Sequence, residues 1–135
     1  MTRHLFAPSL LASALLLTSL SAQAEMAADD FQKAQDAAHM IARKSAQYEL
    51  CGVSNATDLR KALLGFGSRC GASEAELGKV SKAYDAKRAE QMKALVNGNY
   101  VCPVQPAQAR EMIERDLVAM GSVDCKPTTG KLQLK

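Results

Sequence analysis

Apolar side chains recur every three or four residues along most of the chain after residue 30, which is the spacing that places them on one face of an α-helix. The first of these stripes follows two acidic residues that can cap a helix, Asp29 and Asp30, and it stops at Gly52. We therefore expect a helix over residues 31–50. The positions on its buried face are Phe31, Ala34, Ala38, Ile41, Ser45 and Tyr48.

A second, shorter stripe lies between Ser54 and Gly71. Ser54, Asn55 and Thr57 can each cap a helix, and Gly71 suits the left-handed turn that ends one. Gly65 and Gly67, inside the stripe, weaken this helix. The residues on its face are Leu59, Ala62, Leu63, Phe66 and Cys70.

The clearest helix start is Ser73, which forms the pattern of a capping box with Glu76. We expect this third helix to end at Asn97-Gly98-Asn99, a sequence that favours left-handed backbone. Pro106 fits the first turn of a fourth helix, which Gly121 closes. The two faces are Leu77, Val80, Tyr84, Met92, Leu95 and Val96 in the third helix, and Ala109, Met112, Ile113, Leu117 and Met120 in the fourth.

No stretch after residue 24 alternates apolar and polar residues for long enough to indicate a strand. The sequence therefore predicts an all-α fold. The simplest packing is an up-down-up-down four-helix bundle, in which each helix buries its face against two neighbours. An orthogonal arrangement is the alternative, because the second helix is shorter than the third. Residues 25–126 form the predicted helical domain, and residues 127–135 are predicted to be a flexible C-terminal tail.

The first 24 residues have the pattern of a secretory signal peptide. Arg3 and His4 precede a leucine-rich run that is too short to span a bilayer, and the sequence Ala22-Gln23-Ala24 suits a signal peptidase. We expect cleavage before Glu25, which leaves 111 residues. Because the first cysteine is Cys51, no lipid is expected on the new N-terminus. The mature chain is predicted to be periplasmic or secreted, without a stable membrane anchor.

Four cysteines, all outside this leader, indicate two disulfides that hold the bundle together. Their spacing excludes a CxxC redox pair and a paired zinc knuckle; free thiols for redox or copper chemistry are the alternative. Cysteines that flank one helix are about 20 Å apart, whereas a bridge needs α-carbons within about 7 Å. In an up-down bundle the predicted pairs are therefore Cys51 with Cys102, and Cys70 with Cys125.

The charge of the mature chain is nearly balanced. Loss of Arg3 with the leader leaves 16 Lys and Arg against 14 Asp and Glu, and a net charge of +2 is too weak to indicate a polyanionic partner. Tryptophan is absent, and aromatic residues do not alternate with basic ones as they do where bases stack. Nucleic acid is therefore not an expected partner. The sequence contains no cofactor motif, and we expect no cofactor.

Little in the mature sequence indicates catalysis, and we expect a protein that is not an enzyme. Its single histidine is His39, and no serine lies in a GxSxG motif. His39 and Met40 together suggest a copper site, because imidazole and thioether ligands suit copper ions. The other methionines are not clustered, and most fall on apolar faces where methionine usually fills gaps. We expect His39 at the surface or boundary of the domain.

A surface for a protein partner is predicted on the third helix. Basic residues run along this helix, and Arg88 stands one turn after Tyr84, where the apolar face should continue. Arg and Tyr offer large contact areas with polar ends, which favours them in interfaces. Tyr84, Lys87 and Arg88 are therefore the candidate docking surface. We expect Tyr84 and Arg88 to be exposed and to suit an acidic partner.

The leading interpretation is an exported, non-enzymatic protein-binding module, such as an inhibitor, an immunity protein or an accessory subunit. The alternative is a periplasmic carrier of a small molecule or of copper, which predicts a hollow or polar core. A third interpretation is a stress protein that exposes apolar faces when its packing loosens.

Overall fold

The computed structural model describes residues 25–122, which form four helices: α1 (Ala28–Leu50), α2 (Ala56–Arg69), α3 (Glu74–Asn97) and α4 (Pro106–Gly121). No strand occurs among these residues, so the all-α prediction is confirmed. The predicted leader, residues 1–24, and the predicted tail, residues 127–135, lie outside the described residues. Within residues 25–122, no helix is long and apolar enough to cross a membrane.

The helices start and stop close to the predicted positions, although α1 begins earlier than expected, at Ala28. The capping box is present: the Glu76 N–H donates to the Ser73 hydroxyl at 3.2 Å, and the Ser73 N–H donates to the Glu76 carboxylate at 2.8 Å. Pro106 is the first residue of α4. The connections that follow α1, α2 and α3 each contain a residue with positive φ: Gly52, Gly71 and Asn99.

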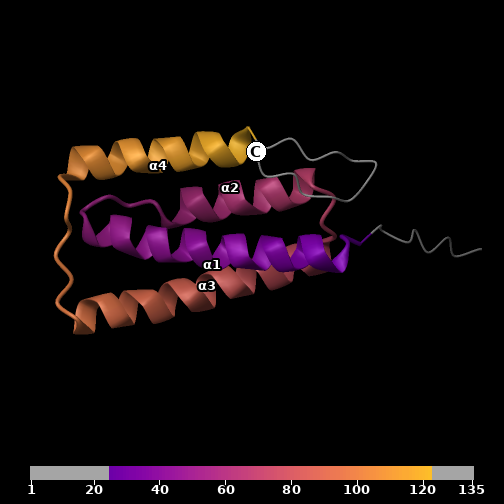
Figure 1. Cartoon of the computed structure of the whole chain (residues 1–135), viewed down its shortest axis with the longest axis horizontal. Helices are drawn as coiled ribbons and strands as arrows, with labels where there is room; N and C mark the ends of the chain where they lie inside the picture. Colours follow the sequence, from indigo (N-terminus) through magenta and orange to yellow (C-terminus); the bar gives the residue numbers. More distant parts are fainter. Residues whose placement is uncertain (1–24, 123–135) are drawn as a thin grey trace, which may run out of the picture.

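Successive helices run antiparallel, so that α1 and α3 are parallel to each other (Figure 1). The prediction that each helix packs against two neighbours is confirmed for α3 and α4 but is wrong for α1 and α2, each of which packs on all three other helices. α1 packs most extensively on α3, whereas α4 packs mainly on α2 and does not contact α3. Small side chains explain the central place of α1, because they allow a neighbouring helix to approach closely. Its buried alanines are Ala34, Ala38, Ala42 and Ala46.

One acidic side chain of α4 binds two side chains of α1. The Asp116 carboxylate accepts hydrogen bonds from the Lys44 ammonium group at 2.8 Å and from the Tyr48 hydroxyl at 2.7 Å. Burial and this hydrogen bond raise the pKa of Tyr48. α4 itself buries only Ala109 and Ile113 completely, so polar contacts supplement a narrow apolar seam.

The apolar face predicted along the whole of α3 is only partly buried. Val80 and Tyr84 are buried, but Met92 and Leu95 are only partly covered, and Val96 is 55% exposed. α2 has 14 residues against 24 in α3, and α4 does not contact α3. Neither of these two helices therefore covers the last turns of α3 (Figure 1).

One of the two predicted disulfides is confirmed. Cys51 and Cys102 are bonded, with their α-carbons 5.1 Å apart, and this bridge joins the end of α1 to the connection between α3 and α4. The other predicted pair includes Cys125, which lies outside the described residues. Cys70 follows α2 and is not a free thiol. Its pairing with Cys125 stays a prediction.

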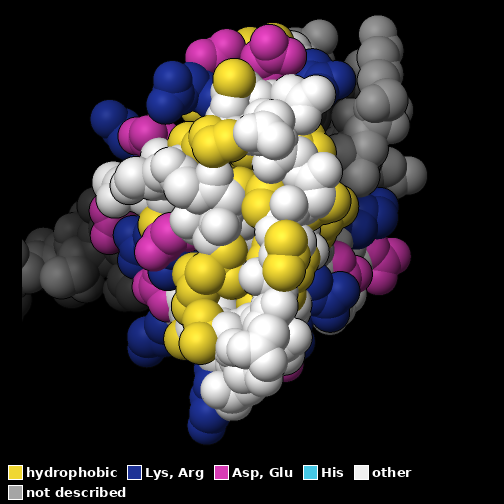
Figure 2. Space-filling model, turned by 90° about the vertical axis from the view of Figure 1, so that its left-hand side faces the viewer, with side chains coloured by type: hydrophobic (Ala, Val, Ile, Leu, Met, Phe, Trp, Pro, Cys, Tyr) yellow, Lys and Arg dark blue, Asp and Glu magenta, His cyan; other side chains and the backbone are white. Residues whose placement is uncertain are grey.

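The two ends of the bundle differ in charge. At the end that holds the Cys51–Cys102 bridge, residues 50–57 and 94–109 contain no Asp, Glu, Lys or Arg. Viewed from this end, hydrophobic and uncharged groups fill the centre of the surface, and charged side chains lie around its edge (Figure 2). We call this end the uncharged pole. The opposite end, where α1 and α3 begin and α2 and α4 end, is the charged pole; it contains Met26, Asp30, Arg69 and Glu76.

Candidate functional site

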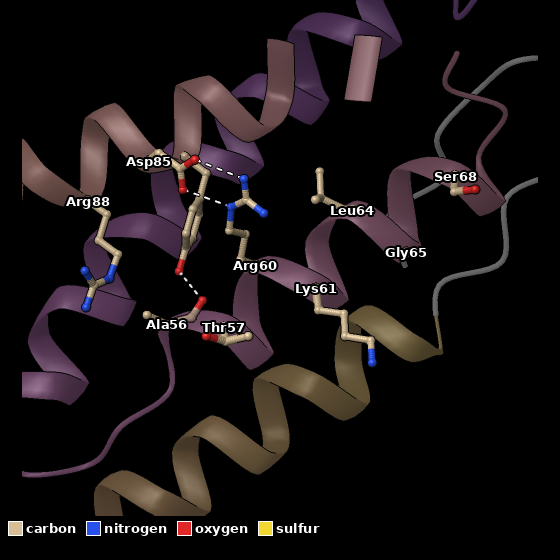
Figure 3. A pocket seen from close by; sticks show the side chains of 10 residues that line it. Ala56, Thr57, Arg60, Lys61, Leu64, Gly65, Ser68, Asp85 and Arg88 are labelled. Atoms are coloured by element: carbon tan, nitrogen blue, oxygen red, sulfur yellow. Dashed lines mark hydrogen bonds and ion pairs between the residues drawn. The ribbon is translucent and has the colours of Figure 1, made fainter. Parts of the chain in front are cut away.

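A cleft of about 690 Å³ lies between α2 and the middle of α3 (Figure 3). Residues on one face of α2 form most of its wall, and three residues within about one turn of α3 form the rest. The lining residues are Ala56, Thr57, Arg60, Lys61, Leu64, Gly65 and Ser68 from α2, and Tyr84, Asp85 and Arg88 from α3.

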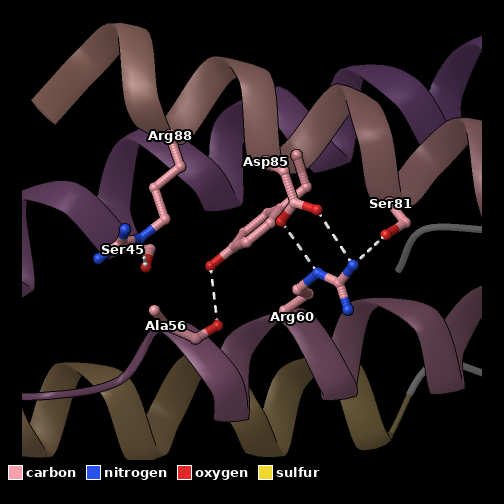
Figure 4. Close-up of polar contacts among 7 residues, drawn as sticks. Ser45, Ala56, Arg60, Ser81, Asp85 and Arg88 are labelled. Atoms are coloured by element: carbon pink, nitrogen blue, oxygen red, sulfur yellow. Dashed lines mark hydrogen bonds and ion pairs between the residues drawn. The ribbon is translucent and has the colours of Figure 1, made fainter.

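An ion pair connects the two walls of the cleft. Arg60 Nε and Nη2 donate to the two Asp85 oxygens at 2.9 and 3.0 Å, and Nη2 also donates to the Ser81 hydroxyl (Figure 4). The hydrogen bonds with Asp85 raise the pKa of the Arg60 guanidinium. Because the side chains of Arg60 and Asp85 are 40% and 53% exposed, the pair contributes little to stability and mainly sets the spacing of the walls.

Tyr84 forms part of the base of the cleft. The expectation that it is exposed is wrong: the residue is only 1% exposed. Its hydroxyl donates to the carbonyl of Ala56 at 3.1 Å, which ties α3 to the first residue of α2. Burial raises the pKa of this phenol. Tyr84 therefore shapes the cleft and does not present its ring to a partner.

Arg88 lines the same cleft, but it is not freely exposed as the sequence suggested. Its Nε donates to the Ser45 hydroxyl at 3.1 Å (Figure 4). Its Nη2 contacts the Glu49 carboxylate, so Arg88 joins α3 to α1. Lys87 does not line the cleft. Its ammonium group instead binds Glu90 of the same helix at 2.8 and 2.9 Å. The structure thus brings two of the three predicted docking residues to one site.

Three charged residues of the cleft were not predicted as site residues. Arg60 and Asp85 lie 25 positions apart on different helices, and neither belongs to a recognisable motif. Lys61 is exposed, and its ammonium group points away from the Arg60–Asp85 pair (Figure 3). The one available signal was that Asp85 directly follows Tyr84, on which the predicted surface was centred.

The charges of the cleft favour an anionic ligand group. Three cationic side chains, Arg60, Lys61 and Arg88, line it together with a single carboxylate, Asp85. Arg60 and Arg88 are already bonded within the fold, which leaves Lys61 as the cation that a ligand reaches most easily. Hydroxyl groups and an aliphatic side chain complete the lining: Thr57, Ser68 and Leu64. These groups provide charge, hydrogen bonds and apolar contact, which are the elements of a binding site.

The suggested copper ligands lie on α1. His39 is partly buried and Met40 is 53% exposed. Within residues 25–122, no group of three or more His, Cys, Asp and Glu side chains could hold a metal ion. The copper interpretation stays a prediction.

Comparisons with known proteins give no match: no family model fits the chain, and neither a curated protein nor a solved structure shows significant similarity to it.

Proposed function

We propose that this protein is an exported protein-binding module that binds an acidic segment of its partner in the cleft between α2 and α3. The leader pattern supports export, with cleavage before Glu25. The Cys51–Cys102 bridge supports an oxidising compartment, because such bonds are rare in the cytosol. The periplasm or the medium is therefore the proposed location.

The excess of cations over carboxylates around an apolar cleft is the observation that carries the binding proposal. A partner that places an Asp or Glu side chain near Lys61 gains a charge-assisted hydrogen bond. An apolar neighbour of that residue packs on Leu64. Charge complementarity of this kind favours the correct partner and speeds the encounter.

The walls of the cleft are fixed before a partner arrives. Tyr84 ties α3 to α2, Arg88 ties α3 to α1, and the Arg60–Asp85 pair sets the distance between the walls. Binding to a preorganised cleft avoids the entropic cost of ordering it. An inhibitor, an immunity protein or an accessory subunit needs such a rigid surface.

Affinity capture tests this proposal. The mature protein, with its bridges formed, serves as bait for periplasmic extract and culture medium, next to the variants Lys61→Glu and Lys93→Glu. Both lysines are exposed, but Lys93 does not line the cleft, so it is a matched control for the change in charge. Arg60 and Arg88 are left intact because each is already bonded to a neighbouring helix within the fold.

We expect one stoichiometric protein partner that the wild type and Lys93→Glu retain and that Lys61→Glu loses. The dissociation constant of the purified pair should rise at least about tenfold in Lys61→Glu, and binding should weaken with added salt. Equal binding by all three baits would exclude this cleft as the interface. If no protein is captured and native mass spectrometry finds a small anion instead, the protein is a carrier.

A further inference from the structure

The first two described residues form an arm that is held against α3. The Met26 N–H donates to both carboxylate oxygens of Glu76, at 3.0 and 3.2 Å. The Met26 side chain is only 8% exposed and packs against Phe66 of α2. The chain is therefore fixed in place at Met26, one residue after the predicted cleavage point.

Glu76 is a buried carboxylate whose hydrogen bonds favour its charged form. In addition to Met26, it binds the N–H and the hydroxyl of Ser73, at 2.8 and 3.1 Å. Burial acts to raise the pKa of Glu76, but these hydrogen bonds and the positive charge of Lys79 outweigh burial and lower it below its ordinary value. Glu76 is therefore negatively charged at neutral pH.

A second buried carboxylate lies at the same pole, in the first turn of α1. Asp30 is 2% exposed, and its Oδ2 atom has no hydrogen-bond partner among the described residues. Its Oδ1 atom contacts the Lys33 ammonium group at 3.4 Å, but the Lys33 side chain is 51% exposed. A buried carboxylate oxygen without a donor is unfavourable unless a cation lies close to it.

Removal of the leader creates a new cation on the arm. Hydrolysis of the Ala24–Glu25 peptide bond consumes one water molecule and leaves a carboxylate on Ala24 and an ammonium group on Glu25. Consecutive residues are about 3.8 Å apart, so the Glu25 nitrogen lies one residue from the N–H that binds Glu76. Asp30 and Glu76 each lie in the first turn of their helix. Because α1 and α3 are parallel, both first turns lie at this pole (Figure 1).

We propose that the α-ammonium group of Glu25 is a structural cation of the charged pole, held by the carboxylates of Glu76 and Asp30. Removal of the leader then completes the fold, because the precursor has a neutral amide nitrogen at this position. This inference rests on the proposed export and on cleavage before Glu25. It assigns a stabilising role to a group that exists only in the processed protein.

The test moves the ammonium group by one residue. One glycine is inserted between Ala24 and Glu25 of the full precursor, so that cleavage after Ala24 leaves an extra residue in front of Glu25. Thermal unfolding of the exported proteins, with and without the glycine, is compared in wild type, Glu76→Gln and Glu74→Gln. Glu74 is the matched control, because it is an exposed acid in the same first turn of α3. N-terminal sequencing identifies the first residue of each protein.

The extra glycine should lower Tm by about 4 °C or more in wild type and in Glu74→Gln, and should have a smaller effect in Glu76→Gln, where one of the two carboxylate charges is absent. If Glu76→Gln does not fold, Asp30→Asn replaces it with the same expectation. An equal change in all backgrounds, or no change in any, overturns this inference and leaves the proposed export intact. In the protein without the inserted glycine, a mature N-terminus other than Glu25 overturns the inference together with the cleavage site on which it rests.

Discussion

The buried polar groups at the two poles of the bundle differ in their chemistry. At the uncharged pole, a covalent bond joins Cys51 to Cys102, and the buried polar group is the neutral amide of Asn55. This amide donates to two backbone carbonyls, at 3.2 and 2.8 Å. At the charged pole, one of the buried groups is the ionised carboxylate of Glu76, which accepts hydrogen bonds from Ser73 and from the N-terminal arm.

This difference determines which conditions act on each pole. A disulfide and an amide do not titrate below neutral pH, so the uncharged pole should be insensitive to acid. Glu76 gains a proton in acid, and salt screens the charges around it. The two ends therefore differ in their response to pH, because the buried amide at the uncharged pole does not titrate in acid and the buried carboxylate at the charged pole does.

The largest effect is expected from removal of the bridge at the uncharged pole. The Cys51→Ala/Cys102→Ala variant opens a loop with a sequence separation of 51, and we expect it to lose about 4 kcal/mol of unfolding free energy in urea titrations. The pH dependence of unfolding should stay as in wild type, because Glu76 lies at the other end. A loss below about 1 kcal/mol would show that the bridge does not restrict the unfolded chain.

A smaller loss is expected from Asn55→Ala, which leaves the carbonyls of Ser45 and Val53 without their buried donor. We expect a loss of about 2 kcal/mol in urea titrations, of equal size at neutral and acidic pH because the amide does not titrate. Ser54→Ala is the control, since this neighbouring residue is exposed and its loss should stay within about 0.5 kcal/mol. Equal losses in the two variants would mean that the amide has no special role.

At the charged pole, Glu76→Gln keeps the shape of the side chain but removes its charge. We expect a loss of about 1 kcal/mol at pH 7, because charge-assisted hydrogen bonds become neutral ones. Folding lowers the pKa of Glu76 below its ordinary value of about 4.3. The charged carboxylate therefore stabilises the fold above that ordinary value, and this stabilisation is lost as the pH falls through the lowered pKa. In urea titrations, wild type and variant should therefore converge below about pH 4.

The exposed Glu74 provides the control for this experiment. Glu74→Gln should cost less than about 0.5 kcal/mol at pH 7. A difference between wild type and Glu76→Gln that persists unchanged into strong acid would contradict a role for the charge. The loss of unfolding free energy in Asn55→Ala should not change with pH. This contrast distinguishes the uncharged pole from the charged pole.

Local features of this fold were predictable because neighbouring residues determine them. The capping box of Ser73 and Glu76, Pro106 at the start of α4, and the helical stripes all follow from backbone geometry within one or two turns. The Cys51–Cys102 pair was predictable from helix lengths and antiparallel order. These inferences need no knowledge of which side chains meet across the core.

Contacts between helices were not predictable in the same way. The pattern suggested that Arg88 interrupts the apolar face of α3 and is exposed. In the structure, Arg88 continues the packed face of α3, because it binds the hydroxyl of Ser45 on the stripe of α1. Gly67 was expected only to weaken α2. A β-carbon there would lie 2.8 Å from a methyl group of Leu77, so this glycine allows α2 and α3 to approach closely. Pairing across 25 or more residues leaves no local signal.

The smallest effect is expected from a charge placed at the tip of the uncharged pole. Val101 is 82% exposed, and Val101→Lys should change the unfolding free energy in urea titrations by less than about 0.5 kcal/mol. The matched variant Val104→Lys alters a partly buried residue that packs against the core, and it should cost at least about 1 kcal/mol. A loss at Val101 as large as that at Val104 would show that folding itself requires an uncharged end. If Val101→Lys leaves the unfolding free energy nearly unchanged, as we expect, the fold tolerates a charge at this tip. The need for stability then does not explain why two long segments of the uncharged pole lack charged residues.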